Sequence, residues 1–212
     1  PTSFNSDMVI FSKGIWGGSE PLLFWFDTSA SSGGYVGANN TNTISVLSYD
    51  GDTEIRMSLP SNSVTSGKLY NIVLTLDGDN NSISIFINGG LKGNYKLANW
   101  NGIQSNADIL TALYTSNNVS PFNGYLLQTL IYDKVLNENE IIQNFNELSE
   151  NRYSAFTDYV VTDLVTRGLQ VHYDPKNNDS ILYGETTVND LANNNNGTLS
   201  STLFNYEGYF EF

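Results

Sequence analysis

The sequence contains no cysteine and few charged residues. Without cysteine, a disulfide framework, a thiolate metal site and a cysteine nucleophile are all excluded. Charged residues make up 15% of the 212 residues, whereas about 25% is usual in a soluble domain. The polar surface must therefore be formed largely by Asn, Ser, Thr and Gly.

Basic residues are especially scarce. Nine Lys and Arg stand against 22 Asp and Glu, which gives a net charge of −13. Nucleic-acid binding needs clusters of basic side chains, and here they are scattered. We therefore expect no nucleic-acid partner and repulsion from anionic membranes, while divalent cations and neutral glycans remain compatible with this charge.

Long hydrophobic runs are also missing. No apolar stretch approaches the ~20 residues of a membrane-spanning helix, so we expect no membrane insertion. No signal peptide is visible, and the chain begins at Pro1 without Met. We expect a cleaved product or part of a longer chain.

Short segments rich in β-branched and aromatic residues are abundant and indicate strands. In residues 82–89 Ile83, Ile85 and Ile87 recur at every second position, which is typical of a strand with one buried face. Asp-Gly and Asn-Gly pairs between the segments favour tight hairpin turns. The spacing predicts an antiparallel sandwich. The expected strands are 7–13, 21–27, 42–50, 54–59, 69–77, 82–89 and 125–133.

One segment has a helical pattern instead. In residues 137–152 the apolar side chains Ile141, Ile142, Phe145 and Leu148 form one stripe. Asn137 and Glu140, three residues apart, have the spacing of a capping box. The sequence predicts one short surface helix here, followed by a connector at 153–167.

The segments 69–93 and 122–148 resemble the concanavalin A-like lectin/glucanase superfamily, in its laminin-G-like branch. The likeness lies in a strand–turn–strand signature, then a Phe-x-Gly strand, an apolar strand ending in Tyr, a Leu and a short helix. The matching positions are Phe122, Gly124, Ile131, Tyr132, Leu136, Glu140 and Ile141. The resemblance implies an all-β jelly-roll β-sandwich with one short helix.

The stretch 168–199 is similar to the opening of such a domain, although it stands near the end of the sequence. The family opens with a Gly-Leu strand ending in Asp, a Val-Asp-Leu turn and an Asn/Gly run before Gly-Thr-Leu. The counterparts are Gly168, Leu169, Tyr173, Asp174, Val188, Asp190, Leu191, Asn193 to Asn196, Gly197, Thr198 and Leu199. Residues 1–13, by contrast, resemble the middle of the domain.

We therefore predict a jelly roll lacking its first strands at 1–152, the connector at 153–167, and the first strands of a second copy at 168–212. The alternative is that residues 168–212 complete the sandwich, in the same chain or in a neighbour. An incomplete sandwich would expose open strand edges, which favours completion.

Catalytic groups are not evident. Retaining glycosidases use two carboxylates about 5–5.5 Å apart, and the glucanases of the superfamily carry them on one strand in a Glu-x-Asp-x-(x)-Glu motif. The nearest approach here, Asp50, Asp52 and Glu54, falls on a glycine turn and fits a solvated hairpin better. The single histidine, His172, lies on an apolar strand and fits a structural role. We predict that the protein is not an enzyme.

Glycan binding is a stronger candidate. Trp16 and Trp100 stand in loop sequences, and Asn99 and Asn101 flank Trp100. An exposed aromatic ring stacks on the apolar face of a sugar while amides bond its hydroxyls. The alternative is that both rings are buried and fill the ends of the sandwich core. Trp25 lies in a continuous apolar stretch and is expected in the core or at a subunit face.

Two acidic loops are candidate calcium sites, because calcium prefers hard oxygen ligands. One contains Asp77, Asp79 and Asn81, and the other begins at Asp174. Neither has the EF-hand layout, and an ordinary turn is the more common structure for each.

From these features we expect a non-catalytic structural or adhesive module of a virion or cell-surface protein, such as a tail fibre or capsid decoration. Its partners would be copies of itself, other surface proteins or host glycans. The alternative is a secreted lectin-like module attached to an enzyme.

Overall fold

The computed structural model describes residues 7–13, 22–28, 41–50, 53–97, 110–112, 122–151, 164–182, 185–199, 203–205 and 209–211. These residues form antiparallel strand pairs and a single helix. The chain divides into two compact units. The first contains Pro1–Leu69, Leu76–Ile83 and Gly93–Gly124, and the second contains Tyr70–Thr75, Ser84–Lys92 and Tyr125–Phe212.

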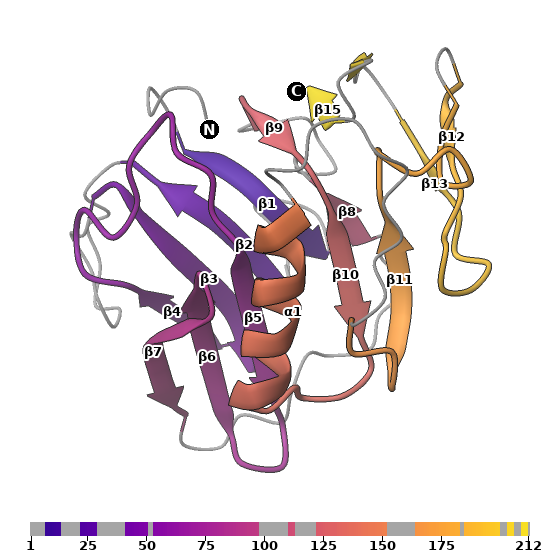
Figure 1. Ribbon diagram of the computed structural model, residues 1–212. Helices are drawn as coiled ribbons and strands as arrows, with labels where there is room; N and C mark the ends of the chain where they lie inside the picture. Colours follow the sequence, from indigo (N-terminus) through magenta and orange to yellow (C-terminus); the bar gives the residue numbers. More distant parts are fainter. Residues whose placement is uncertain are drawn as a thin grey trace. The chain divides into compact units, whose positions relative to one another are not determined.

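The first unit is built on a five-stranded sheet of order β4-β3-β2-β1-β8 (Figure 1). Its strands are β1 Met8–Lys13, β2 Leu22–Asp27, β3 Thr43–Asp50, β4 Thr53–Ser58 and β8 Leu110–Ala112. Neighbouring strands run antiparallel, and β1 carries a bulge between Val9 and Phe11. β3 and β4 pair as far as Asp50 and Thr53, as expected for the predicted tight turn between them.

One face of this sheet forms an apolar core. Because side chains alternate along a strand, Phe24 and Phe26 of β2 share this face with their registered neighbours on β1, β3 and β4. The ring of Phe26 lies 6.0 Å from that of Phe122. Each buried side chain of this kind contributes about 1.5–3 kcal/mol to folding. The buried members are Met8, Phe24, Phe26, Ile44, Val46 and Met57.

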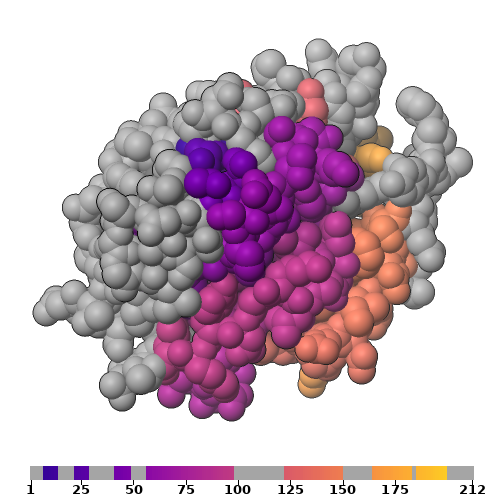
Figure 2. Space-filling model, turned by 90° about the vertical axis from the view of Figure 1, so that its left-hand side faces the viewer, coloured from indigo at the N-terminus to yellow at the C-terminus, as the bar shows by residue number. Residues whose placement is uncertain are grey.

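A three-stranded sheet of order β5-β6-β7 has residues in both units. Its strands are β5 Ile72–Asp77, β6 Ser82–Ile87 and β7 Gly90–Lys96. β6 is buried along its whole length, whereas β7 has exposed Leu91 and Lys92 and lies at an edge of the sheet. Residues 60–69, which follow β4, lie mainly at the surface shown in Figure 2.

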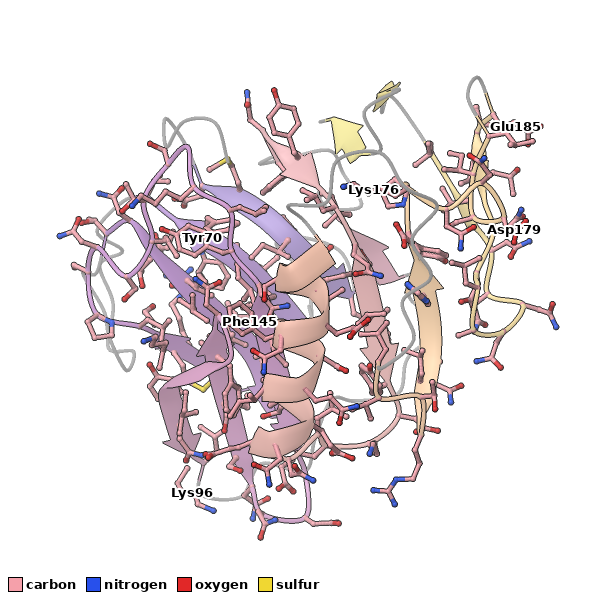
Figure 3. The ribbon with its side chains drawn as sticks, in the orientation of Figure 1. Tyr70, Lys96, Phe145, Lys176, Asp179 and Glu185 are labelled. Atoms are coloured by element: carbon pink, nitrogen blue, oxygen red, sulfur yellow. The ribbon has the colours of Figure 1, made fainter. Side chains whose placement is uncertain are left out.

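The second unit contains helix α1 (Glu138–Asn151) and the remaining strands. α1 packs on β6 through Ile141, which lies in one buried cluster with Phe86, Leu136 and Val165. Phe145 of α1 lies against Gly89 in the turn before β7 (Figure 3).

The strands of the second unit pair as β10-β11, β12-β13 and β14-β15-β9. Their bounds are β9 Tyr125–Leu126, β10 Thr129–Tyr132, β11 Leu169–Tyr173, β12 Thr187–Val188, β13 Gly197–Thr198, β14 Leu203–Asn205 and β15 Tyr209–Glu211. A second small core gathers Ile181 and Val188 with Leu126, Tyr173 and Leu199. The division of the chain at residues 152 and 168 stays a prediction.

Candidate functional site

The four residues predicted to bind a glycan, Trp16, Asn99, Trp100 and Asn101, lie outside the described residues. Their role therefore stays a prediction. The described residues include the third tryptophan, Trp25, and all four residues of the predicted calcium sites.

The acidic loop at Asp77 is an ordinary turn by its hydrogen bonds. The two carboxylate oxygens of Asp77 accept bonds from the backbone N–H and the side-chain amide of Asn80, at 3.0 and 2.8 Å. These bonds from Asn80 lower the pKa of Asp77. Asp79 is exposed, and Asn81 has a left-handed backbone conformation with φ of 49°. The loop is thus held together by its own side chains.

Asp174 also supports a turn. Its carboxylate accepts the backbone N–H of Lys176 at 2.9 Å, and burial raises its pKa. Lys176 and Asp179 in the loop after β11 are labelled in Figure 3. In the part of the chain that the structure describes, no group of three or more His, Asp and Glu side chains could hold a metal ion. The calcium sites remain predictions.

The second face of the five-stranded sheet has a composition unlike the core. Leu23, Trp25 and Asp27 point to this face from β2, and the register places polar partners beside them on β3 and β4. We call this set the tryptophan face. Its members are Val9, Ser12, Leu23, Trp25, Asp27, Thr43, Ser45, Leu47, Arg56 and Ser58.

An apolar patch occupies one part of the tryptophan face. Val9, Leu23, Trp25 and Leu47 form a buried cluster. The guanidinium of Arg56 lies over the Trp25 ring, with Cζ 4.8 Å from the ring centroid. A guanidinium in this position is attracted by the negative face of the indole ring. Arg56 is therefore held over the ring of Trp25 by a cation–π contact.

A chain of hydroxyl groups occupies the other part. Ser45 Oγ donates to Asp27 Oδ2 at 3.0 Å and lies 2.6 Å from Ser58 Oγ. Since Ser45 has one hydroxyl proton and gives it to Asp27, Ser58 must donate to Ser45. All three residues are buried. The face thus combines an aromatic ring, a cation, a carboxylate and oriented hydroxyls.

Arg56 is the one member of the tryptophan face that solvent reaches, since it is partly exposed while the other nine are buried. The prediction of a buried Trp25 is confirmed, at 2% exposure. The polar neighbours were not foreseen. The alternate positions Leu23, Trp25 and Asp27 could have indicated a partly polar face. The continuous apolar run of β2 instead favoured an apolar environment on both faces.

Comparison with protein families gives one match. The family of concanavalin A-like lectins and glucanases, laminin-G type, matches residues 12–142, more than half of the chain. The chain belongs to the concanavalin A-like lectin/glucanase superfamily. The resemblance found in the sequence and the all-β sandwich fold are confirmed.

Among solved structures, this superfamily member is similar to a candidate carbohydrate-binding protein from Bacteroides ovatus ATCC 8483. The two share 16% sequence identity with a TM-score of 0.54, and the match covers 91% of this chain. The chain spans about half (51%) of the length of that protein. At this identity the likeness shows the fold alone. No curated protein matches the sequence.

Concanavalin A-like folds also include glycosidases, so His172 and its neighbours need a chemical interpretation. Nε2 of His172 lies 2.6 Å from the side-chain amide of Gln128. Burial lowers the pKa of His172, although Asp174 and Asp190 nearby partly offset this effect. Asp190 is itself occupied by backbone N–H groups. These contacts support the structural role expected for His172.

No helix among the described residues is long and apolar enough to cross a membrane.

Proposed function

We propose that this chain is a non-catalytic, lectin-like module that binds a glycan through Arg56, the partly exposed residue of the tryptophan face. The observation that carries the proposal is the partly exposed Arg56 over the buried Trp25, with the buried Asp27 and Ser45 on the same sheet face. Burying such groups costs free energy relative to an apolar face of the same shape. Polar groups kept in place at this cost are typical of functional sites.

The chemistry of the face suits a neutral or weakly polar sugar. Guanidinium N–H groups donate to sugar hydroxyls, and Arg56 also has an apolar stem. Its Nε is buried, so the contacts with a sugar would come from the terminal amino groups. Ser58, Ser45 and Asp27 form a chain of hydrogen bonds that runs in one direction on the same face. The fold likeness to a candidate carbohydrate-binding protein supports the same class of ligand.

Binding without hydrolysis is favoured by the positions of the carboxylates. Hydrolysis of a glycosidic bond by the usual route needs two carboxyl groups on either side of it. The strand register places two acidic residues on this side of the sheet, Asp27 beside Thr43 and Glu54 beside Tyr49. Thr43 and Tyr49 are six residues apart on β3, roughly 20 Å at ~3.3 Å per residue, so Asp27 and Glu54 are too far apart to act on one glycosidic bond. Asp27 also accepts a hydrogen bond from Ser45.

We further propose that the module belongs to a virion or cell-surface structural protein and meets glycans or copies of itself there. The low fraction of charged residues and the composition rich in Asn and Ser support an extracellular setting. The alternative is a secreted module attached to an enzyme. A structural module would assemble with its own copies, whereas an enzyme-attached module would be monomeric, so sedimentation of the purified chain separates the two.

The site is tested by calorimetric titration with a panel of cell-wall and envelope glycans. Arg56→Met keeps the apolar stem over Trp25 and removes the donors. We expect it to weaken binding by about tenfold or more, since a hydrogen bond from a charged group contributes about 1.5–3 kcal/mol. Arg167→Met is the matched control, because the Arg167 side chain is 83% exposed and lies outside the face.

The predicted loop tryptophans provide the competing outcome. If Trp16→Ala or Trp100→Ala abolishes binding while Arg56→Met leaves it unchanged, the glycan site is formed by the loops. In that case the tryptophan face has a structural role alone.

A further inference from the structure

The segment that resembles the opening of a domain lies, in this structure, beside the strand that resembles the end of one. β11 pairs antiparallel with β10, with Leu130 opposite His172 and Ile131 opposite Val171. We propose that residues 164–199 are the closing segment of the unit formed by residues 125–151. They would then belong to this fold, with the order of its elements permuted, and not begin a separate domain.

The first support is the anchor of the closing segment on α1 and β10. The backbone N–H of Val165 donates to Asn144 Oδ1 at 2.8 Å, and the Asn144 amide donates to the hydroxyl of Tyr132 at 2.9 Å. The Tyr132 hydroxyl donates in turn to the Val165 carbonyl at 2.9 Å. This ring of three bonds joins the helix, the strand and the closing segment. Without the segment, Asn144 would lose the backbone partner that satisfies its buried amide oxygen.

The second support is apolar packing. Val165 is buried in the cluster of Phe86, Leu136 and Ile141, so the segment completes a core whose other members precede it in the sequence. Farther along, Ile181 and Val188 pack with Leu126 of β9. The segment is therefore held at both ends by residues of the unit that it closes.

The third support is the outer edge of β11, which the segment covers with its own side chains. The N–H of His172 donates to Asp190 Oδ1 at 2.8 Å, and its carbonyl accepts the N–H of Leu191 at 2.9 Å. The amide of Asn193 donates to the carbonyls of Leu169 and Gln170 at 3.2 and 3.1 Å. Asn195 adds a bond to the Gln170 carbonyl at 2.9 Å.

These bonds assign a structural role to Asn193 and Asn195 of the asparagine run at 193–196. An open strand edge is a template for pairing with another chain. Here amide and carboxylate groups occupy the edge that a further strand would need, so within the described part of the chain the sheet ends at β11. The run thus acts as an edge cap, and the closing segment both adds a strand and stops further addition.

The pairing can be tested by an engineered disulfide, because the protein has no cysteine of its own. The N–H and C=O of His172 point away from β10 toward Asp190 and Leu191, so Leu130 and His172 form a non-hydrogen-bonded pair. The Cα atoms of such a pair are about 4.5 Å apart, within the range that a disulfide spans. The variant is Leu130→Cys with His172→Cys, and the two single-cysteine variants are its controls.

We expect mild oxidation of the double variant to give a disulfide-linked monomer on non-reducing electrophoresis. Covalent dimers in excess of those from the single-cysteine controls would show that the segment pairs with a second copy, and would overturn the proposal. Two free thiols in a folded protein would overturn it as well.

A second measurement avoids any change in the core. Gln170 Nε2 of β11 donates to Oδ2 of Asp133, the residue that follows β10, at 3.0 Å. Gln170→Lys places an amine beside that carboxylate, and a carbodiimide should join the two within one chain. Mass spectrometry of the digest reads the link. A link found in dimers alone, or no link in folded protein, contradicts the proposal.

Discussion

Gly168 is the residue on which the turn directly before β11 depends. Its φ of +80° lies in the left-handed region, and its carbonyl accepts the N–H of Asp133 at 2.9 Å. A Cβ added there would lie 2.7 Å from Asp133 Oδ1 and 2.8 Å from Lys134 Cγ. Both the backbone and the space around it therefore require glycine.

We expect Gly168→Ala to lower the free energy of unfolding by about 2–3 kcal/mol, measured by urea denaturation. Gly67→Ala is the matched control, since Gly67 has a similar φ of +72° but no atom within 4 Å of the added Cβ. It should cost about 1 kcal/mol from backbone strain alone. Equal losses in the two variants would show that the contacts at Gly168 do not matter.

At the scale of single elements, α1 begins with the capping box that the sequence predicts. The N–H of Glu140 donates to Asn137 Oδ1 at 3.0 Å, and the N–H of Asn137 donates to Glu140 Oε2 at 2.9 Å. Lys134 lies 2.5 Å from Glu140 Oε1. These bonds, with that from Lys134 the largest, lower the pKa of Glu140.

We expect Asn137→Ala to reduce stability by about 1 kcal/mol, because it leaves a helical N–H without its cap. Asn139→Ala, two residues later on the exposed side of α1, removes the same amide without removing a cap. It should leave the urea midpoint unchanged or slightly raised. A loss in Asn139→Ala as large as in Asn137→Ala would mean that capping is not the cause.

His172 on β11 and the neighbouring Asp174 and Asp190 make the stability of the protein depend on pH. Burial lowers the pKa of His172 from about 6.5, so the unfolded chain takes up the proton first as the pH falls. This stabilisation is complete above pH 6.5 and is lost as the pH falls through the lower folded value. For Asp190 burial acts to raise the pKa, but bonds from backbone N–H groups outweigh it and lower the pKa, so its contribution is lost below about pH 3.8. Asp174 acts in the opposite sense, because its pKa is raised.

Between pH 7.5 and pH 5.5 the protonation of His172 should therefore affect stability more than that of Asp174 or Asp190. We expect the urea midpoint of the wild-type protein to fall over this interval, and to fall less in His172→Gln, which cannot be protonated. Identical pH profiles for the two proteins would remove His172 as the cause.

Much of the element structure could be predicted from the sequence. β1 to β6 and α1 lie where period-two and helical patterns place them, because each carries enough apolar side chains to bury one face. β7 was missed, since Gly90–Lys96 is an edge strand with little buried apolar surface. The expected strand 125–133 is divided into β9 and β10. The polar side of β2 was also missed, because register, which decides the neighbours of Trp25, cannot be read from one strand.

At the scale of the whole molecule, composition excluded partners more readily than it identified them. The net charge of −13 and the lack of cysteine reduce the number of plausible partners and site chemistries, but they do not identify a binding site. Family membership fixes the fold over residues 12–142 and leaves the ligand open. The proposed site, the tryptophan face, depends on the pairing of β2, β3 and β4.

The central claim is that the intact protein binds glycans, and intrinsic tryptophan fluorescence tests it most directly. The purified chain would be titrated with neutral cell-wall and envelope glycans, with and without calcium. Trp25 lies at the proposed site under Arg56, so binding should give a saturable shift in emission. A flat response across the panel, from protein shown by circular dichroism to be folded, would contradict the claim.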